Sequence, residues 1–150
     1  MMGGVAVLAI WMLALVGASC GGAGRDPWLA ALRKERLATM VLPGGKLVLN
    51  SETKEHTSLG KAITARILRA YAFRDPHAAT VSRNQAIRAA IASGWHVNPE
   101  RIDPAGPYYG SKKLSPGAAT LTIGKFTSDG VVKVSIQLDQ GACPRELCGQ

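Results

Sequence analysis

Residues 119–138, ATLTIGKFTSDGVVKVSIQL, carry the strongest structural signal of this chain. Two runs with the composition of strands, 119–126 and 131–138, flank the dipeptide Asp129-Gly130, which favours a tight hairpin turn. In the second run the apolar residues alternate with polar ones, as on a strand with one buried and one solvated face. Its apolar side comprises Val132, Val134, Ile136 and Leu138. The stretch predicts an α+β domain in which an antiparallel sheet is covered on one face by two helices.

Two segments upstream have the spacing of amphipathic helices. The first begins at Asp26-Pro27, where Asp suits the N-cap and Pro the first helical position, and it ends before 43–45 (PGG). The second runs from His77 or Ser82 to Ser93, with Gly94 at the left-handed position that ends many helices. The expected buried residues are Leu29, Leu32, Leu37 and Met40 in the first helix and Val81, Ile87, Ala90 and Ile91 in the second.

The remaining segments of the domain predict strands and loops. Residues 46–50 suggest a strand, and 51–60 suggest a polar loop. The spacing in 63–73 fits either a strand or a helix, and its β-branched and aromatic content favours a strand. Residues 95–97 predict a short strand or extended segment, and 98–107 predict a loop rich in Pro and Asp.

The first 24 residues contain no charged side chain and have the order of an export signal. Residues 5–16 form an apolar core of the length typical of signal peptides, and small residues follow it. The order predicts a signal peptide at 1–19, a flexible tether at 20–25 and a single domain at 26–150.

The segment 17–20, GASC, resembles the lipobox of bacterial lipoproteins, although Gly17 stands where that family usually has Leu. The resemblance implies that Cys20 receives a lipid and becomes the new N-terminus, on the outer face of the cell membrane. The segments 86–95 (AIRAAIASGW) and 109–114 (YGSKKL) are similar to small exported lipoproteins of actinobacterial type. That similarity implies the envelope location and an α+β domain, and no activity.

Two other interpretations of the N-terminus stay open. Ordinary cleavage would release a secreted protein, and an uncleaved apolar segment would act as a transmembrane helix. The residues before the apolar core include no Lys or Arg, whereas Arg25, Arg33, Lys34 and Arg36 follow it. With an uncleaved helix this charge distribution would leave the domain in the cytoplasm.

The chain has a net charge of +8. This charge favours acidic partners such as lipid headgroups or an anionic polymer of the envelope, and a protein partner is a further possibility. Since the basic residues are dispersed and not interleaved with aromatic ones, we expect no nucleic-acid partner. Outside the cytoplasm, Cys143 and Cys148 are expected to form a disulfide. The alternative is a metal site that also recruits His56, His77 or His96, but their spacing is not that of metal ligands.

No known catalytic, metal or cofactor motif occurs in the chain, so we expect a non-enzymatic binding module. Tyr108, Tyr109, Lys112 and Lys113 are the predicted contact patch, on a loop that exposes both tyrosines. The alternative is that one tyrosine packs beneath the loop. An exported enzyme with a site in the 95–113 region, where Glu100 and Asp103 could act as acid and base, is the other function considered.

The lipobox resemblance makes a direct prediction. Cells that express the full chain should incorporate labelled palmitate into it, and the Cys20→Ala variant should lose that label because the acceptor thiol is gone. Label that survives the substitution would exclude Cys20 as the lipidated residue.

Overall fold

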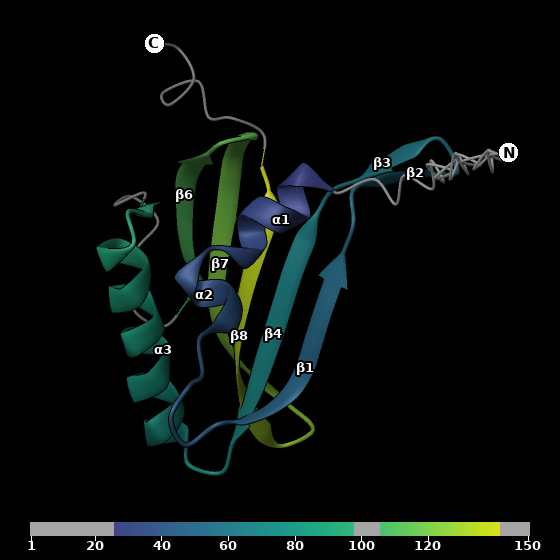
Figure 1. Ribbon diagram of the computed structural model, residues 1–150. Coiled ribbons are helices and arrows are strands. Elements are labelled where there is room, and N and C mark those ends of the chain that lie inside the picture. The colour runs from purple at the N-terminus through teal and green to yellow at the C-terminus, as the bar shows by residue number, and fades with distance from the viewer. Residues whose placement is uncertain (1–25, 98–105, 142–150) are drawn as a thin grey trace, which may run out of the picture.

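The computed structural model describes residues 26–97 and 106–141, which form one mixed α+β unit (Figure 1). Its six-stranded sheet has the order β1-β4-β8-β7-β6-β5, and all neighbouring strands are antiparallel. The helices lie on one face of the sheet, and a separate hairpin, β2–β3, projects from one end. The elements are α1 (Pro27–Arg33), α2 (Arg36–Thr39), β1 (Lys46–Thr53), β2 (His56–Ser58), β3 (Lys61–Ile63), β4 (Arg66–Phe73), α3 (Pro76–Ala92), β5 (His96–Val97), β6 (Tyr108–Leu114), β7 (Gly117–Ser128) and β8 (Val131–Gln140).

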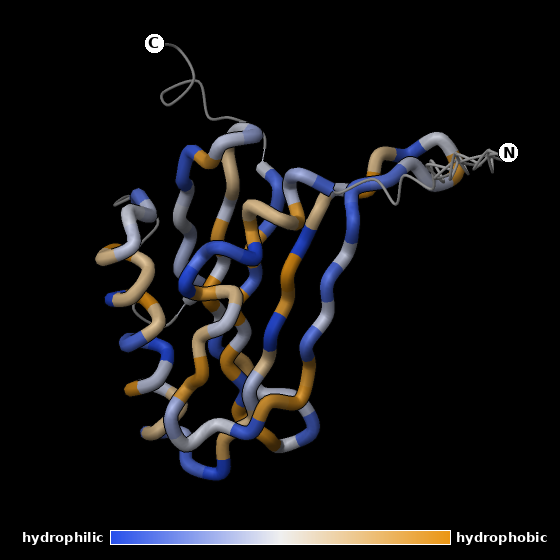
Figure 2. Tube along the Cα trace, in the orientation of Figure 1, coloured by the Kyte–Doolittle hydropathy of each residue, from blue (hydrophilic) through white to orange (hydrophobic). Residues whose placement is uncertain are grey.

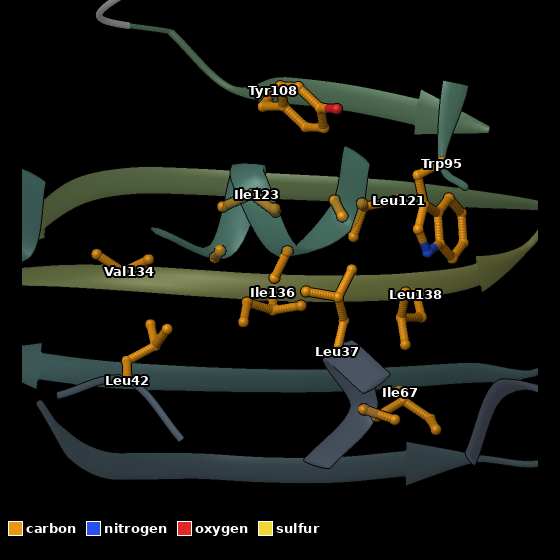
Figure 3. Close-up of a cluster of buried hydrophobic side chains, with 14 of the residues drawn as sticks. Leu37, Leu42, Ile67, Trp95, Tyr108, Leu121, Ile123, Val134, Ile136 and Leu138 are labelled. Atoms are coloured by element: carbon orange, nitrogen blue, oxygen red, sulfur yellow. The ribbon is translucent and has the colours of Figure 1, made fainter. Parts of the chain in front are cut away.

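The predicted β7–β8 hairpin is confirmed and supplies the middle of the sheet. Asp129 and Gly130 form its turn with φ of 56° and 73°, both in the left-handed region that such a turn requires. Val134, Ile136 and Leu138 point toward the helices and are at most 1 % exposed. They pack with residues of α2, β4 and β7 in the cluster shown in Figure 3.

The first predicted helix is divided into α1 and α2 by extended backbone at Glu35. A straight helix would separate Leu32 and Leu37 by about 140° around its axis, because each residue turns the helix by about 100°. The break lets both leucines reach the core, and each is 0 % exposed. Three helices, rather than the two expected, therefore cover the sheet face.

Helix α3 packs against the sheet through small residues. Ala79, Ala86 and Ala90 are fully buried, whereas Val81 and Ile91, which were expected in the core, are 47 % and 55 % exposed. The prediction for these two residues was wrong because the alanine side permits closer approach of the helix to β7 and β8. Gly94 adopts φ 81° after the helix, as expected of its end.

The strand prediction for 63–73 holds for β4, while Ile63 belongs to β3. Figure 2 shows that β4 contains both hydrophobic and strongly hydrophilic segments. Arg69 lies on the apolar side of β4, where its guanidinium donates to the carbonyl oxygens of Ala38 and Met40 at 3.2 and 3.3 Å. The segment 51–60 is not the expected loop, because β1 extends to Thr53 and pairs with β4, and β2 follows.

The carboxylate of Asp26 joins two elements. It accepts hydrogen bonds from the amides of Trp28 and Leu29 at the start of α1, at 2.9 and 3.0 Å. It also accepts one from the amide of Glu55 at the base of the β2–β3 hairpin, at 2.6 Å. Burial acts to raise the pKa of Asp26, but these hydrogen bonds to the charged form prevail and hold the pKa below its ordinary value.

Because its pKa is lowered in the folded state, ionised Asp26 stabilises the domain above its ordinary pKa of about 3.9, and this contribution is lost as the pH falls through the folded-state pKa. Asp26→Ala should therefore lower the free energy of unfolding at neutral pH by about 1–2 kcal/mol. The difference in unfolding free energy between Asp26→Ala and the unchanged protein should shrink at acid pH. Urea unfolding of the full chain in mild detergent at neutral and acid pH measures both. Asp26→Asn, which still caps α1, is the control with the smaller loss, and a fully stable alanine variant would contradict the role.

Candidate binding surface

The sheet face opposite the helices is not covered by any described helix (Figure 1). We call this surface the open face. Cross-strand register assigns its residues, since directly paired residues of neighbouring antiparallel strands share a face. Its main residues are Lys46, Leu49 and Ser51 of β1, Leu68, Ala70 and Ala72 of β4, Lys133, Ser135 and Gln137 of β8, Thr122, Gly124 and Phe126 of β7, and Tyr109, Ser111 and Lys113 of β6.

Small residues form the middle of the open face. Ala70 pairs with Ser135, and Ser135 pairs with Gly124, so three adjacent strands present little side-chain bulk. A methyl group at Gly124 would lie 3.2 Å from Oγ of Ser135, which is a tight contact. The surface is therefore recessed in the middle of the open face, because the surrounding side chains are larger.

Cations and aromatic rings stand at the periphery of the open face. One row across the strands reads Lys46, Ala72, Lys133 and Phe126. The ring residues are accessible, with Phe126 45 % and Tyr109 42 % exposed. Among the described residues, Lys46, Lys113 and Lys133 form no ion pair, whereas Arg66 pairs with Asp139. The open face thus offers uncompensated positive charge beside apolar rings.

The predicted contact patch is divided between the two faces of the sheet. Its four residues lie on strand β6, not on a loop, and the side chains of a strand alternate between faces. Tyr109 and Lys113 belong to the open face, but Tyr108 is only 6 % exposed in the core, where burial raises the pKa of its hydroxyl. The expectation of two exposed tyrosines was wrong for Tyr108, and the alternative of one packed tyrosine describes the structure.

Lys112 forms an ion pair within the domain. Its Nζ lies 2.8 and 3.0 Å from the carboxylate oxygens of Glu35, which immediately precedes α2, and 6.0 Å from the ring centre of Trp95. Glu35 is 9 % exposed. The pair holds strand β6 to the corner between the two short helices, so Lys112 has a structural role rather than a place in a contact surface.

The other candidate residues do not converge on a reaction centre. His96 is exposed on β5 opposite Ser111, and Nδ1 of His56 lies 2.8 Å from the carbonyl oxygen of Lys54. A hollow of about 310 Å³ near the hairpin contains one ionisable lining residue, Arg66. Within 26–97 and 106–141, no three His, Cys, Asp or Glu residues are grouped as metal ligands.

Several predicted features lie outside the described residues: the lipidation site Cys20, the pair Cys143 and Cys148, and the acidic residues Glu100 and Asp103. In the part of the chain that the structure describes, no helix is long and apolar enough to span a bilayer. The open face itself was not anticipated as a site, although the alternation of Lys133, Ser135 and Gln137 already marked its solvated side.

Removal of Lys112 should leave the Glu35 carboxylate partly buried without its partner. Lys112→Met should lower the free energy of unfolding by about 1–2 kcal/mol, less than for a fully buried pair because Lys112 is partly exposed. Glu35→Gln in the same chain should restore part of the loss, as a double-mutant cycle by urea unfolding would measure. Lys113→Met, the same change at the neighbouring exposed residue, should shift stability by less than about 0.5 kcal/mol. Equal losses of unfolding free energy in Lys112→Met and Lys113→Met would contradict the structural role of Lys112.

Comparison of the chain with protein-family models, curated protein sequences and solved structures finds no significant match. The fold and the surfaces described above are therefore the basis for any functional proposal.

Proposed function

We propose that this protein is a lipid-anchored protein of the bacterial cell envelope, whose domain is a non-enzymatic binding module for an anionic polymer of that envelope. Cys20 carries the anchor, and the open face binds the polymer. The observation that supports the binding role best is the combination on the open face of Lys46, Lys113 and Lys133, none paired with a described acid, with the exposed rings of Tyr109 and Phe126.

The arrangement suits an extended acidic polysaccharide. Lys46 and Lys133 lie two strands apart, which places their backbones about 10 Å from each other. A chain that crosses the strands would meet both ammonium groups and then the Phe126 ring. The low middle formed by Ala70, Ser135 and Gly124 leaves room for sugar rings, whose apolar faces pack on aromatic side chains. Repeated acidic groups would give many weak contacts rather than one deep pocket.

The anchor part of the proposal rests on the N-terminal sequence. Intact mass of the purified protein distinguishes its alternatives: cleavage before Cys20 with added acyl mass supports the lipoprotein, cleavage without it indicates secretion, and a retained Met1 indicates a transmembrane segment. Each acyl chain buries many methylene groups, and two or more chains hold a protein stably on a bilayer.

Binding to polygalacturonate, an acidic polysaccharide, tests the open face. The full chain in mild detergent should bind immobilised polygalacturonate but not neutral dextran, and the affinity should fall with added salt. The triple variant Lys46→Gln, Lys113→Gln, Lys133→Gln should bind about tenfold more weakly, which corresponds to about 1.4 kcal/mol. Tyr109→Ser with Phe126→Ser should weaken binding without changing its salt dependence.

The matched control removes the same charge elsewhere. Lys34→Gln, Arg36→Gln, Arg88→Gln takes three cations from the helical side of the domain and should retain binding. Equal weakening by the two triple variants would show that net charge alone attracts the polymer, and would overturn the assignment to the open face.

A further inference from the structure

The tip of the β2–β3 hairpin presents a leucine entirely to solvent. The two strands are joined by Leu59 and Gly60, with φ of 49° and 74°, and Leu59 is 101 % exposed. Figure 1 shows the hairpin projecting from the sheet at the end where α1 begins. An apolar side chain is thus held outside the body of the domain.

Turn geometry does not account for this leucine. The β7–β8 hairpin has the same two-residue turn with nearly the same φ values, and there the first position is Asp129. Asp, Asn and Gly tolerate the left-handed conformation, whereas a leucine side chain disfavours it. The turn would be less strained with Asn at residue 59. A residue that is unfavourable for the turn and buries nothing in the domain points to a contact outside it.

The surroundings of Leu59 are basic and close to the point where the chain enters the domain. Lys61 follows the turn and Lys54 precedes β2, and residues 56–63 contain no acidic side chain. Glu55, at the base of the hairpin, is engaged by the side-chain amide of Gln140, at 3.1 Å, and its own amide donates to Asp26. An apolar tip flanked by lysines is complementary to the surface of a bilayer that contains anionic lipids.

The reach of the chain permits this contact. Asp26 lies six positions after Cys20, so an anchor at Cys20 keeps the base of the hairpin within about 20 Å of the membrane. The hairpin extends about 10–13 Å from its base to Leu59, since each strand residue advances about 3.3 Å. One leucine and two lysines would hold a free protein only weakly, but the tether makes their binding intramolecular and raises the effective concentration.

We propose that the Leu59 tip inserts into the headgroup region of an anionic bilayer, as a second membrane contact that sets the orientation of the domain. This inference rests on the membrane anchor of the proposed function. The leucine side chain enters the apolar boundary, and Lys54 and Lys61 lie against lipid phosphates. The partner is the lipid surface itself, not a soluble phosphate or another protein.

Photo-crosslinking of the full chain in vesicles tests the contact. The vesicles contain about one third phosphatidylglycerol and two thirds phosphatidylcholine, with a trace of lipid that carries a diazirine in its acyl chain. Mass spectrometry of the peptides should find lipid on residues 54–63 as well as on the N-terminal segment. Leu59→Asn should reduce the label on 54–63 by about tenfold. It should leave the N-terminal label unchanged and should keep or raise the midpoint of thermal unfolding, because Asn suits the turn.

Val41→Asn is the matched control, since Val41 is an exposed apolar residue, 70 % accessible, outside the hairpin. It should not change the label on 54–63. Label on the N-terminal segment but not on 54–63, or hairpin label that persists in Leu59→Asn, would overturn the inference while the anchor stands. Absence of label from both segments would overturn the anchor and, with it, the hairpin contact.

Discussion

Contact between one side of β8 and the three helices holds the described domain together. Val134, Ile136 and Leu138 project from the strand that lies between β4 and β7, and α1, α2 and α3 all pack toward this strand. Because strand side chains alternate, the same backbone must direct Lys133, Ser135 and Gln137 away from the helices. Burial on one side therefore creates the open face on the other, and the surface proposed for binding is a consequence of how the core is built.

The Lys112–Glu35 pair and the Asp26 cap show how polar groups complete this one-sided core. Each reaches between elements that are distant in sequence: β6 to the α1–α2 corner, and α1 to the β2–β3 hairpin. Arg69 does the same for the carbonyl groups that end α2. These contacts position short helices that contain too few residues to be stable alone. The apolar contacts form the core, and the polar contacts fix how the elements are oriented around it.

Local patterns in the sequence predicted the parts of the fold that local chemistry determines. Short stretches of sequence were enough to predict four such features: the Asp-Gly turn, the alternation in β8, the cap at Asp26 and the end of α3 at Gly94. The break at Glu35 was not, because it depends on the partner lysine 77 residues later and on the space available to Leu37. Likewise, helical spacing predicted that Val81 and Ile91 are buried, but α3 packs against the sheet through its alanine side and leaves both residues exposed. The patch at 108–113 was divided for a similar reason: hydrophilic composition suggested a loop, and pairing with β7 made it a strand.

The position of β8 in the sheet also affects when this domain can fold. The strand is the last element in the described chain, yet it lies between β4 and β7, so β1 and β4 have no connection to β6 and β7 until residues 131–140 are available. A growing polypeptide that stops short of these residues has two separate sheet fragments and an incomplete interior. The complete sheet consequently cannot form until residues 131–140 have been synthesised, and until then the edges of β4 and β7 that β8 later covers remain open to pairing with other chains.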